Sequence, residues 1–511
     1  MLKRILFLTV LASSAVYAQP YYYYFKHNSA YDVPGYSGDI YRLDLMTNSS
    51  ELFVKDAGRV NGPIFHNSDQ SRIFFQVRFS LATVDVSDPS LQIKYALNGI
   101  NEVNEIKDSP KTNRYYITID DMQDSTRTIV VDRQMVEPID TIYEDYTSYN
   151  SFLSQDGKSL YRLQDDSTGI FFSEYIIDSK QQMKPQRVGN IGPFVAAVLS
   201  DSRSGYALVS YVYNLDTNLT SLEYTICNVN TREIIASIKF PWNSNGYLVP
   251  AENCIVLAKL ISDRSQAGGE YHTGDISVFD VHAGTLLQRL KLPPEGKILL
   301  FDNYPNMVYY YFEKKQTSIN IDLTKLPTIG TINTQNVLVG SGAFTLSVTG
   351  RNFTTTSKVR LNGTNRATTF VSDTLLQATI RAGDVDTATT VYIAVRDSIA
   401  PSSHATTDSV ALNIISVPQQ SLQPILDCVT QINDTTYTAW FGYENDDTTS
   451  IFVPVGPQNE FSPTPNERTQ PIVFAPGRKD KIFSVTFNGK NLTWKLNGNE
   501  VVASKKSPRC N

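Results

Sequence analysis

Short apolar strands, each followed by a polar turn, repeat along the first two-thirds of the chain. In every repeat one strand, such as IYRLD or TIVVD, ends in an aspartate or an asparagine. These seven residues are Asp44, Asp85, Asp132, Asp178, Asn228, Asp280 and Asp322. Their spacings are 41, 47, 46, 50, 52 and 42 residues. A repeat of about 40–50 residues built only from short strands predicts a β-propeller, so we expect an all-β fold with seven blades.

The residue that ends each strand has a structural explanation. A short side-chain oxygen can accept hydrogen bonds from turn amides one or two residues further on, which forms an Asx turn. We therefore interpret the seven residues as blade-turn residues. The alternative is a ring of carboxylates around a metal, and it requires them to lie near the central channel.

The sequence does not show how the ring closes. The first repeat begins with Tyr21–Phe25 and has no strand before it, whereas the seventh, with Met307–Phe312, has no tail strand before the pattern changes. Propellers usually close by sharing strands between the chain ends. Six or eight blades therefore stay open as alternatives.

One hairpin carries a resemblance to known propellers. In the fourth repeat the turn Ser154–Lys158 contains Asp156-Gly157 and precedes the strand Ser159–Leu163. Asp-Gly is a strong hairpin signal, because both residues tolerate positive φ. The string resembles the hairpin of YVTN, lactonase-like and Tol-type propellers, and this resemblance implies a shared fold without a shared activity.

From Pro327 the pattern changes to strict alternation of apolar and polar residues with Gly and Asn turns, which predicts a small β-sandwich over residues 327–416. The strings Gly350–Phe353 (GRNF) and Leu361–Gly363 (LNG) resemble the IPT/TIG family. That family has an immunoglobulin-like fold and occurs in cell-surface receptors, in extracellular enzymes and in some transcription factors. The resemblance implies a spacer or a protein-contact module.

After a linker at residues 417–424, the segment 425–511 contains the strings TAWFGY, VGPQNEFSP and LTWKLNG. It resembles a recurrent module of large secreted and surface proteins, which implies a second small β-sandwich and no particular activity. We expect Trp440 and Trp494 to fill its core, and a sugar-binding platform is the alternative.

The first residues are typical of a secretory signal. Lys3 and Arg4 precede an apolar stretch, Ile5–Val16, and a small-residue cleavage site ends at Ala18. We expect residues 1–18 to be removed and the propeller to occupy residues 19–326, with an uncleaved anchor as the alternative. No later stretch is long and apolar enough to span a membrane. The mature protein is therefore expected to be secreted, or associated with the cell surface.

Export permits disulfides among the four cysteines. Cys428 and Cys510 bracket the last segment, and a bridge between them fits the module it resembles. Cys227 ends a strand of the fifth repeat and Cys254 opens a strand of the sixth, so we expect a second bridge between them. A zinc site is disfavoured, because the cysteines form no C-x-x-C pair.

Composition and motifs give little chemistry. The chain has 41% hydrophobic and 19% charged residues, a net charge of −6, and no run of five Lys or Arg. These values are globular and disfavour nucleic-acid binding. We find no G-x-S-x-G, H-E-x-x-H or phosphate-loop motif. The histidines are isolated, although His272 and His282 share one repeat, and the acidic loops Asp120–Asp124 and Glu444–Asp447 lack a complete calcium ligand set.

Six N-x-S/T sequons are candidate glycosylation sites if the host is a eukaryote, and their number is about what chance predicts. They begin at Asn48, Asn218, Asn352, Asn362, Asn433 and Asn491.

The favoured hypothesis is an exported binding or adhesion protein in which the propeller recognises an extracellular protein or glycan and the sandwiches act as spacers or docking modules. No cofactor, metal or catalytic residue is predicted, so an enzyme is less favoured than a binding protein. The alternatives are an extracellular propeller hydrolase, lactonase-like or carbohydrate-active, and a structural matrix protein. Export, the all-β modular pattern and the lack of a catalytic motif are the reasons for this order.

Overall fold

The computed structural model describes residues 20–510 apart from 28–36, 68, 89, 110–111, 122–125, 135–137, 144–147, 154–157, 167–168, 190–196, 204–205, 214–220, 229–230, 232, 241–243, 262–270, 302–303 and 401–402. The predicted signal segment, the turn at residues 154–157 and Asn218 lie outside the described residues. The chain divides into two compact units, the first ending at Thr324 and the second starting at Lys325, and the second also includes Leu287–Lys291.

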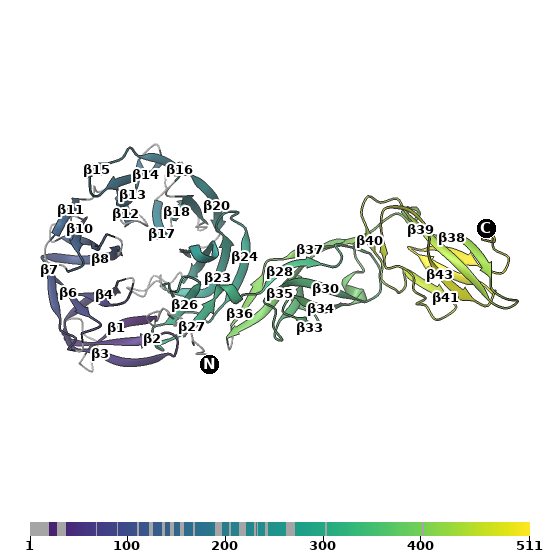
Figure 1. Ribbon diagram of the computed structural model, residues 1–511, viewed down its shortest axis with the longest axis horizontal. Helices are drawn as coiled ribbons and strands as arrows, with labels where there is room; N and C mark the ends of the chain where they lie inside the picture. Colours follow the sequence, from purple (N-terminus) through teal and green to yellow (C-terminus); the bar gives the residue numbers. More distant parts are fainter. Residues whose placement is uncertain are drawn as a thin grey trace, which may run out of the picture. The chain divides into compact units, whose positions relative to one another are not determined.

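Seven antiparallel sheets make up the described part of the first unit, and they stand around a ring (Figure 1). In chain order they are β1 (Tyr21–His27), β2 (Gly38–Asp44) and β3 (Ser49–Gly58); β4 (Val60–His66), β5 (Arg72–Val77), β6 (Ser80–Asp85) and β7 (Lys94–Asn98); β8 (Ile100–Ser109), β9 (Arg114–Asp121), β10 (Thr126–Asp132) and β11 (Pro138–Tyr143); β12 (Ser148–Leu153), β13 (Ser159–Asp166), β14 (Gly169–Ile176), β15 (Gln181–Gln182) and β16 (Gln186–Gly189); β17 (Ala197–Arg203), β18 (Tyr206–Tyr213), β19 (Ser221–Asn228) and β20 (Ile234–Phe240); β21 (Ser244–Val249), β22 (Cys254–Leu260) and β23 (His272–Asp280); β25 (Lys297–Leu299), β26 (Met307–Phe312) and β27 (Thr317–Asp322). This is a seven-bladed β-propeller.

The alternation of side chains along each strand packs neighbouring blades together. On β5, Ile73 and Phe75 belong to an apolar cluster shared with the first sheet. Phe74, between them, belongs to a different cluster, shared with the third sheet. Successive side chains of a strand point to opposite faces, so one strand fills the spaces on both sides of its sheet. The sheets are therefore buried on both faces, and their strands read as near-continuous apolar runs.

The first and seventh sheets have three strands each, as the sequence indicated, and side chains join them. The ring of Tyr22 on β1 lies 4.4 Å from that of Tyr311 on β26. The Asn48 carboxamide accepts a hydrogen bond from the backbone N–H of Ser318 at 2.7 Å and donates one to its carbonyl oxygen at 3.3 Å. Asn48 thus supplies the donor and acceptor that a neighbouring strand would give, and the ring closes at seven blades.

The second unit contains two sandwiches. In the middle sandwich, β28 (Thr328–Ile332), β30 (Phe344–Arg351), β34 (Leu375–Ile380) and β33 (Thr368–Ser372) form one sheet. The opposite sheet contains β29 (Asn336–Leu338), β31 (Lys358–Leu361), β32 (Thr364–Asn365), β35 (Thr389–Ala400), β36 (Ser403–Thr407) and β37 (Val410–Ile415), and β36 pairs with residues Gln288–Lys291 of β24 (Leu286–Lys291). Leu346, Val348 and Ile393 lie in the core between the sheets. This arrangement is consistent with the expected immunoglobulin-like fold.

The terminal sandwich packs β38 (Leu422–Gln431), β39 (Tyr437–Asn445) and β43 (Gly477–Phe487) against β41 (Asn459–Ser462), β44 (Leu492–Leu496) and β45 (Asn499–Ala503). Two short strands, β40 (Ile451–Phe452) and β42 (Val473–Phe474), extend the large sheet of the middle sandwich. The Cys428–Cys510 disulfide is present, with Cα atoms 4.9 Å apart. Leu422, within the segment expected to be a linker, is fully buried in this core.

The two sandwiches share their cores. β29 pairs in parallel with β40 through Val337 and Phe452. Leu338 packs in the core of the terminal sandwich, while Phe452 packs in that of the middle sandwich. Each sandwich therefore completes the other, and neither core is closed by its own segment alone.

Replacing Asn48 tests the closure of the ring. Asn48 has φ of 57°, a conformation that glycine adopts freely, so Asn48→Gly removes the carboxamide without backbone strain. We expect the variant to lose about 1–2 kcal/mol of unfolding free energy, measured by urea denaturation. The matched control is Asn113→Gly, at an exposed residue that also has φ of 57°. Equal stability losses in the two variants would show that the amide of Asn48 does not hold the blades together.

Candidate functional site

The strand-ending residues form turns. Oδ1 of Asp85 accepts hydrogen bonds from the N–H of Ser87 at 2.9 Å and from its Oγ at 2.6 Å. The hydroxyl bond of Ser87 is the largest cause of a lowered pKa at Asp85. Four other strand-ending residues accept hydrogen bonds in the same way, through their Oδ1 atoms, from residues two or three positions further on. They are Asp44, Asn228, Asp280 and Asp322. These side-chain oxygens already accept hydrogen bonds within their own turns, as expected of residues with a structural role.

The two remaining turn positions have other partners. Asp178 forms an ion pair with Arg114 at 2.8 Å, and this hydrogen bond raises the pKa of the arginine. Asp132 lies opposite Arg114 in the pairing of β10 with β9. Within the part of the chain that the structure describes, no three His, Cys, Asp or Glu side chains gather as a metal site would require.

A half-exposed aromatic surface lies on the first blade. The rings of Tyr24 and Tyr41 are stacked, with centroids 5.7 Å apart and planes at 18°. The Lys26 Nζ lies 4.5 Å from the centroid of Tyr41 and 5.3 Å from that of Tyr24. Leu52 lies opposite Tyr41 on β3 and is 49% exposed. We call these four residues the tyrosine–lysine patch.

The patch adjoins the seventh sheet. Tyr22 packs against that sheet, and Tyr24 points the same way because it is two residues further along β1. The Tyr24 hydroxyl donates to Oε1 of Gln316, in the turn between β26 and β27, at 2.9 Å. Lys26 follows Tyr24 by two residues on β1 and makes no ion pair with the described residues. Aromatic faces beside a cation and an aliphatic side chain are typical of protein-binding hot spots.

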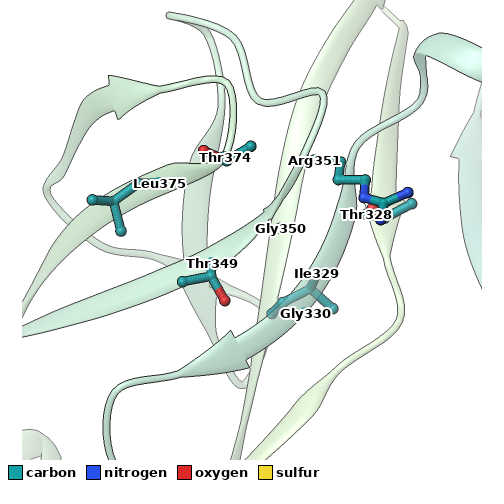
Figure 2. A pocket seen from close by; sticks show the side chains of 8 residues that line it. All are labelled: Thr328, Ile329, Gly330, Thr349, Gly350, Arg351, Thr374 and Leu375. Carbon is teal, nitrogen blue, oxygen red and sulfur yellow. The ribbon is translucent and has the colours of Figure 1, made fainter.

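An open groove of about 600 Å³ lies on the middle sandwich (Figure 2). Its lining residues are Thr328, Ile329, Gly330, Thr349, Gly350, Arg351, Thr374 and Leu375. Arg351 and Leu375 lie at opposite ends of this set. A Cβ at Gly350 would lie 2.1 Å from the carbonyl oxygen of Thr328, so only glycine fits there. The Thr349 hydroxyl is already bonded to that of Thr331 at 2.8 Å.

His272 is a buried structural residue. Its Nδ1 lies 3.1 Å from the carbonyl oxygen of Gly296, which fixes the proton on that nitrogen. Its Nε2 lies 3.3 Å from the hydroxyl of Tyr247, which donates to it. Burial lowers the pKa of His272 to about 4. The ring is therefore neutral and fully hydrogen-bonded at neutral pH, whereas His282 is exposed.

The two tryptophans differ in position. Trp494 is fully buried, and its Nε1 donates to Oδ1 of the buried Asn459 at 2.9 Å. Its ring stacks on Phe461 at 6.0 Å. Trp494 thus fills the core of the terminal sandwich, as the sequence indicated, and cannot present its face to a sugar. Trp440 is half-buried on β39 and lies outside that core, so its expected core position was wrong.

The expected Cys227–Cys254 bridge was wrong, because both cysteines are free and buried. Ile226 and Ile255 pack together in the cluster between the fifth and sixth sheets. Cys227 follows Ile226 and Cys254 precedes Ile255, so strand alternation directs both thiols away from the shared space. Burial raises the pKa of each thiol to about 12.

The sequons differ in how the asparagine amide is used. Nδ2 of Asn352 donates to the carbonyl oxygen of Leu326 at 3.0 Å, and Nδ2 of Asn48 donates to Ser318. The side chains of Asn362, Asn433 and Asn491 are exposed.

The burial of the two thiols predicts their reactivity. At pH 8 we expect neither Cys227 nor Cys254 to react with a thiol reagent in the folded protein, and both to react in denaturant, because both are inaccessible and protonated. Asn61→Cys adds an exposed thiol and serves as the control that must react at once. Rapid reaction of both cysteines in the native protein, or no reaction of either after unfolding, would contradict this structure.

The buried His272 predicts an acid-sensitive fold. Its pKa is about 4 in the folded protein against 6.5 for an unperturbed histidine, so the unfolded chain binds the proton more tightly. Stability is fully present above pH 6.5 and falls as the pH drops toward 4, by on the order of 3 kcal/mol. We expect His272→Gln to remove this part of the pH dependence of unfolding, while His282→Gln leaves it unchanged. The same slope in both variants would exclude His272 as its source.

Comparisons with known proteins show likenesses of fold alone. No family model matches the chain, and neither does any curated protein. Among solved structures, the chain is similar to one in a mitotic checkpoint complex at 10% identity, over 55% of this chain and 80% of that one, with a TM-score of 0.38. It is similar to Hsv2 of Kluyveromyces lactis at 12% identity, over 62% and 98%, with a TM-score of 0.32. It is also similar to a chain of a nidogen–laminin complex at 9% identity, over 51% and 90%, with a TM-score of 0.30.

Proposed function

We propose that this chain is an exported binding protein, secreted or held at the cell surface, whose propeller recognises an extracellular protein. The observation that supports it is the tyrosine–lysine patch. A stacked tyrosine pair, a lysine without an ion pair among the described residues, and an exposed leucine give the composition of an interface centre. A protein partner accounts for the exposed leucine better than a glycan does, because an aliphatic side chain gains from desolvation.

The remaining parts take supporting roles in this proposal. Residues 1–18 are the export signal, and the IPT/TIG-like segment 327–416 and the terminal segment 425–511 are spacer or docking modules. Their shared core gives a spacer of fixed internal geometry. The Cys428–Cys510 disulfide supports export, because such bonds persist in oxidising compartments. Among the described residues no helix is long and apolar enough to cross a membrane.

Binding to intact cells tests the proposal. Labelled protein starting at Gln19 is titrated onto cells of the source organism, and we expect saturable binding to a surface protein. Tyr41→Ala and Lys26→Ala should each weaken this binding about 5–30-fold, the range expected of hot-spot residues. Tyr95→Ala is the matched control, because Tyr95 on β7 is a 60% exposed tyrosine outside the patch.

Each outcome has a distinct meaning. Binding that never saturates rules out the recognition function itself. If binding saturates and neither patch substitution weakens it, the protein has a recognition function but the patch is not the binding site. A loss of binding after treatment of the cells with glycosidase rather than protease would replace the protein partner by a glycan.

A further inference from the structure

The sequons can be sorted by what the folded structure does with the amide nitrogen. Nδ2 of Asn48 and of Asn352 donates to a backbone carbonyl oxygen. Asn362 and Asn433 are exposed, and only their Oδ1 atoms are engaged, as acceptors. Within the described residues, Nδ2 of these two side chains makes no hydrogen bond. An N-linked sugar replaces one hydrogen of this nitrogen, so the two groups are not equivalent.

The geometry at Asn48 excludes a sugar without loss of a contact. A substituted amide is planar and trans, so the sugar C1 would take the place of the hydrogen on the same side as Oδ1. That side of the Asn48 carboxamide faces Ser318. Its Oδ1 accepts a hydrogen bond from the N–H of Ser318, and its Nδ2 donates one to the carbonyl oxygen of Ser318. A glycan there would break the closure of the ring.

Asn362 has an exposed aromatic neighbour. It lies in the turn between β31 and β32, and its backbone N–H donates to the carbonyl oxygen of Tyr392 at 2.9 Å. The N–H of Tyr392 donates to Oδ1 of Asn362 at 2.8 Å. The Tyr392 side chain is 54% exposed. The two hydrogen bonds hold Nδ2 beside a bare aromatic residue, and the C–H face of a sugar packs on such rings.

Asn433 has an exposed aliphatic neighbour. It lies in the turn between β38 and β39, where its Oδ1 accepts from the N–H of Thr435 at 3.0 Å and from its hydroxyl at 3.2 Å. Ile432, the residue before it, is 60% exposed. Ile432 and Tyr392 are thus among the most exposed large apolar side chains of the described residues, and each adjoins a sequon whose amide nitrogen is available.

We propose that Asn362 and Asn433 carry N-linked glycans whose first sugars cover Tyr392 and Ile432. The donor is an oligosaccharide on a polyprenyl pyrophosphate. The Nδ2–C1 bond forms as the C1–O bond breaks, the polyprenyl pyrophosphate leaves, and Nδ2 gives one proton to the transferase. This inference depends on export through a glycosylating pathway and is independent of the tyrosine–lysine patch.

Peptide mass spectrometry of the full chain, secreted by its own cells, tests the sites. An amidase that removes N-glycans in ¹⁸O water converts each glycosylated asparagine to a labelled aspartate. We expect label at Asn362 and Asn433 and none at Asn48 or Asn352. Asn362→Gln and Asn433→Gln should each remove one glycan from the intact mass. Unlabelled Asn362 and Asn433, or label at Asn48 or Asn352, would overturn the assignment.

The contact with Tyr392 has its own test. Removing the glycans should lower the Tm of the wild-type chain by about 2–4 °C, because a bare aromatic face returns to water. The same treatment of Tyr392→Ser should lower the Tm by less, and Tyr95→Ser, at an exposed tyrosine of the propeller that adjoins no sequon, should respond as the wild type does. Equal shifts in wild type and Tyr392→Ser would show that the sugar does not pack on this ring, even with Asn362 occupied.

Discussion

Every propeller sheet is packed between two others, and this constraint decides where polar and functional groups can lie. The central strand β5 shows it, since Ile73 and Phe74 enter different apolar clusters on opposite faces of one sheet. A strand buried on both faces has no polar side to spare. Hydrogen-bonding side chains therefore gather where strands end, which is why an aspartate or asparagine closes one strand of each blade. The same constraint confines binding surfaces to the rims and to places where one sheet extends past its neighbour.

The closure of the ring creates such a place. The first and seventh sheets are joined by the Asn48 carboxamide and by paired tyrosines. The turn at Gln316 ends the seventh sheet beside Tyr24, and Tyr24 packs against the cluster that contains Tyr309 and Tyr311. Lys26 and Leu52 are exposed there, and Tyr41 is half-buried. The patch therefore lies on the first sheet, beside the place where the ring closes.

The sequence predicted what depends on local pattern and missed what depends on the direction of side chains. The period of the strand-ending residues gave the correct number of blades, because each turn forms within its own hairpin. The Cys227–Cys254 bridge failed although strand ends were placed well, because both thiols alternate with isoleucines that fill the space between the blades. The patch needs the register of three strands, because Tyr24, Tyr41 and Leu52 each lie on a different one. The groove needs Gly350 beside the Thr328 carbonyl, and the GRNF string marked this glycine by resemblance without indicating which backbone atom lies against it.

The amide of Asn48 also bears on the patch itself. Asn48 lies two residues before Ser50, whose hydroxyl is 2.5 Å from that of Tyr24. A glycan on Asn48 would therefore stand beside the tyrosine pair and cover it. The Asn48 amide is instead hydrogen-bonded to Ser318. These hydrogen bonds both close the ring and keep a glycan away from the patch. At Tyr392 and Ile432 the adjoining amides are available, and a sugar can shield these side chains. The amide of Asn48 thus leaves the patch open to a partner, whereas the amides beside Tyr392 and Ile432 are available for a sugar.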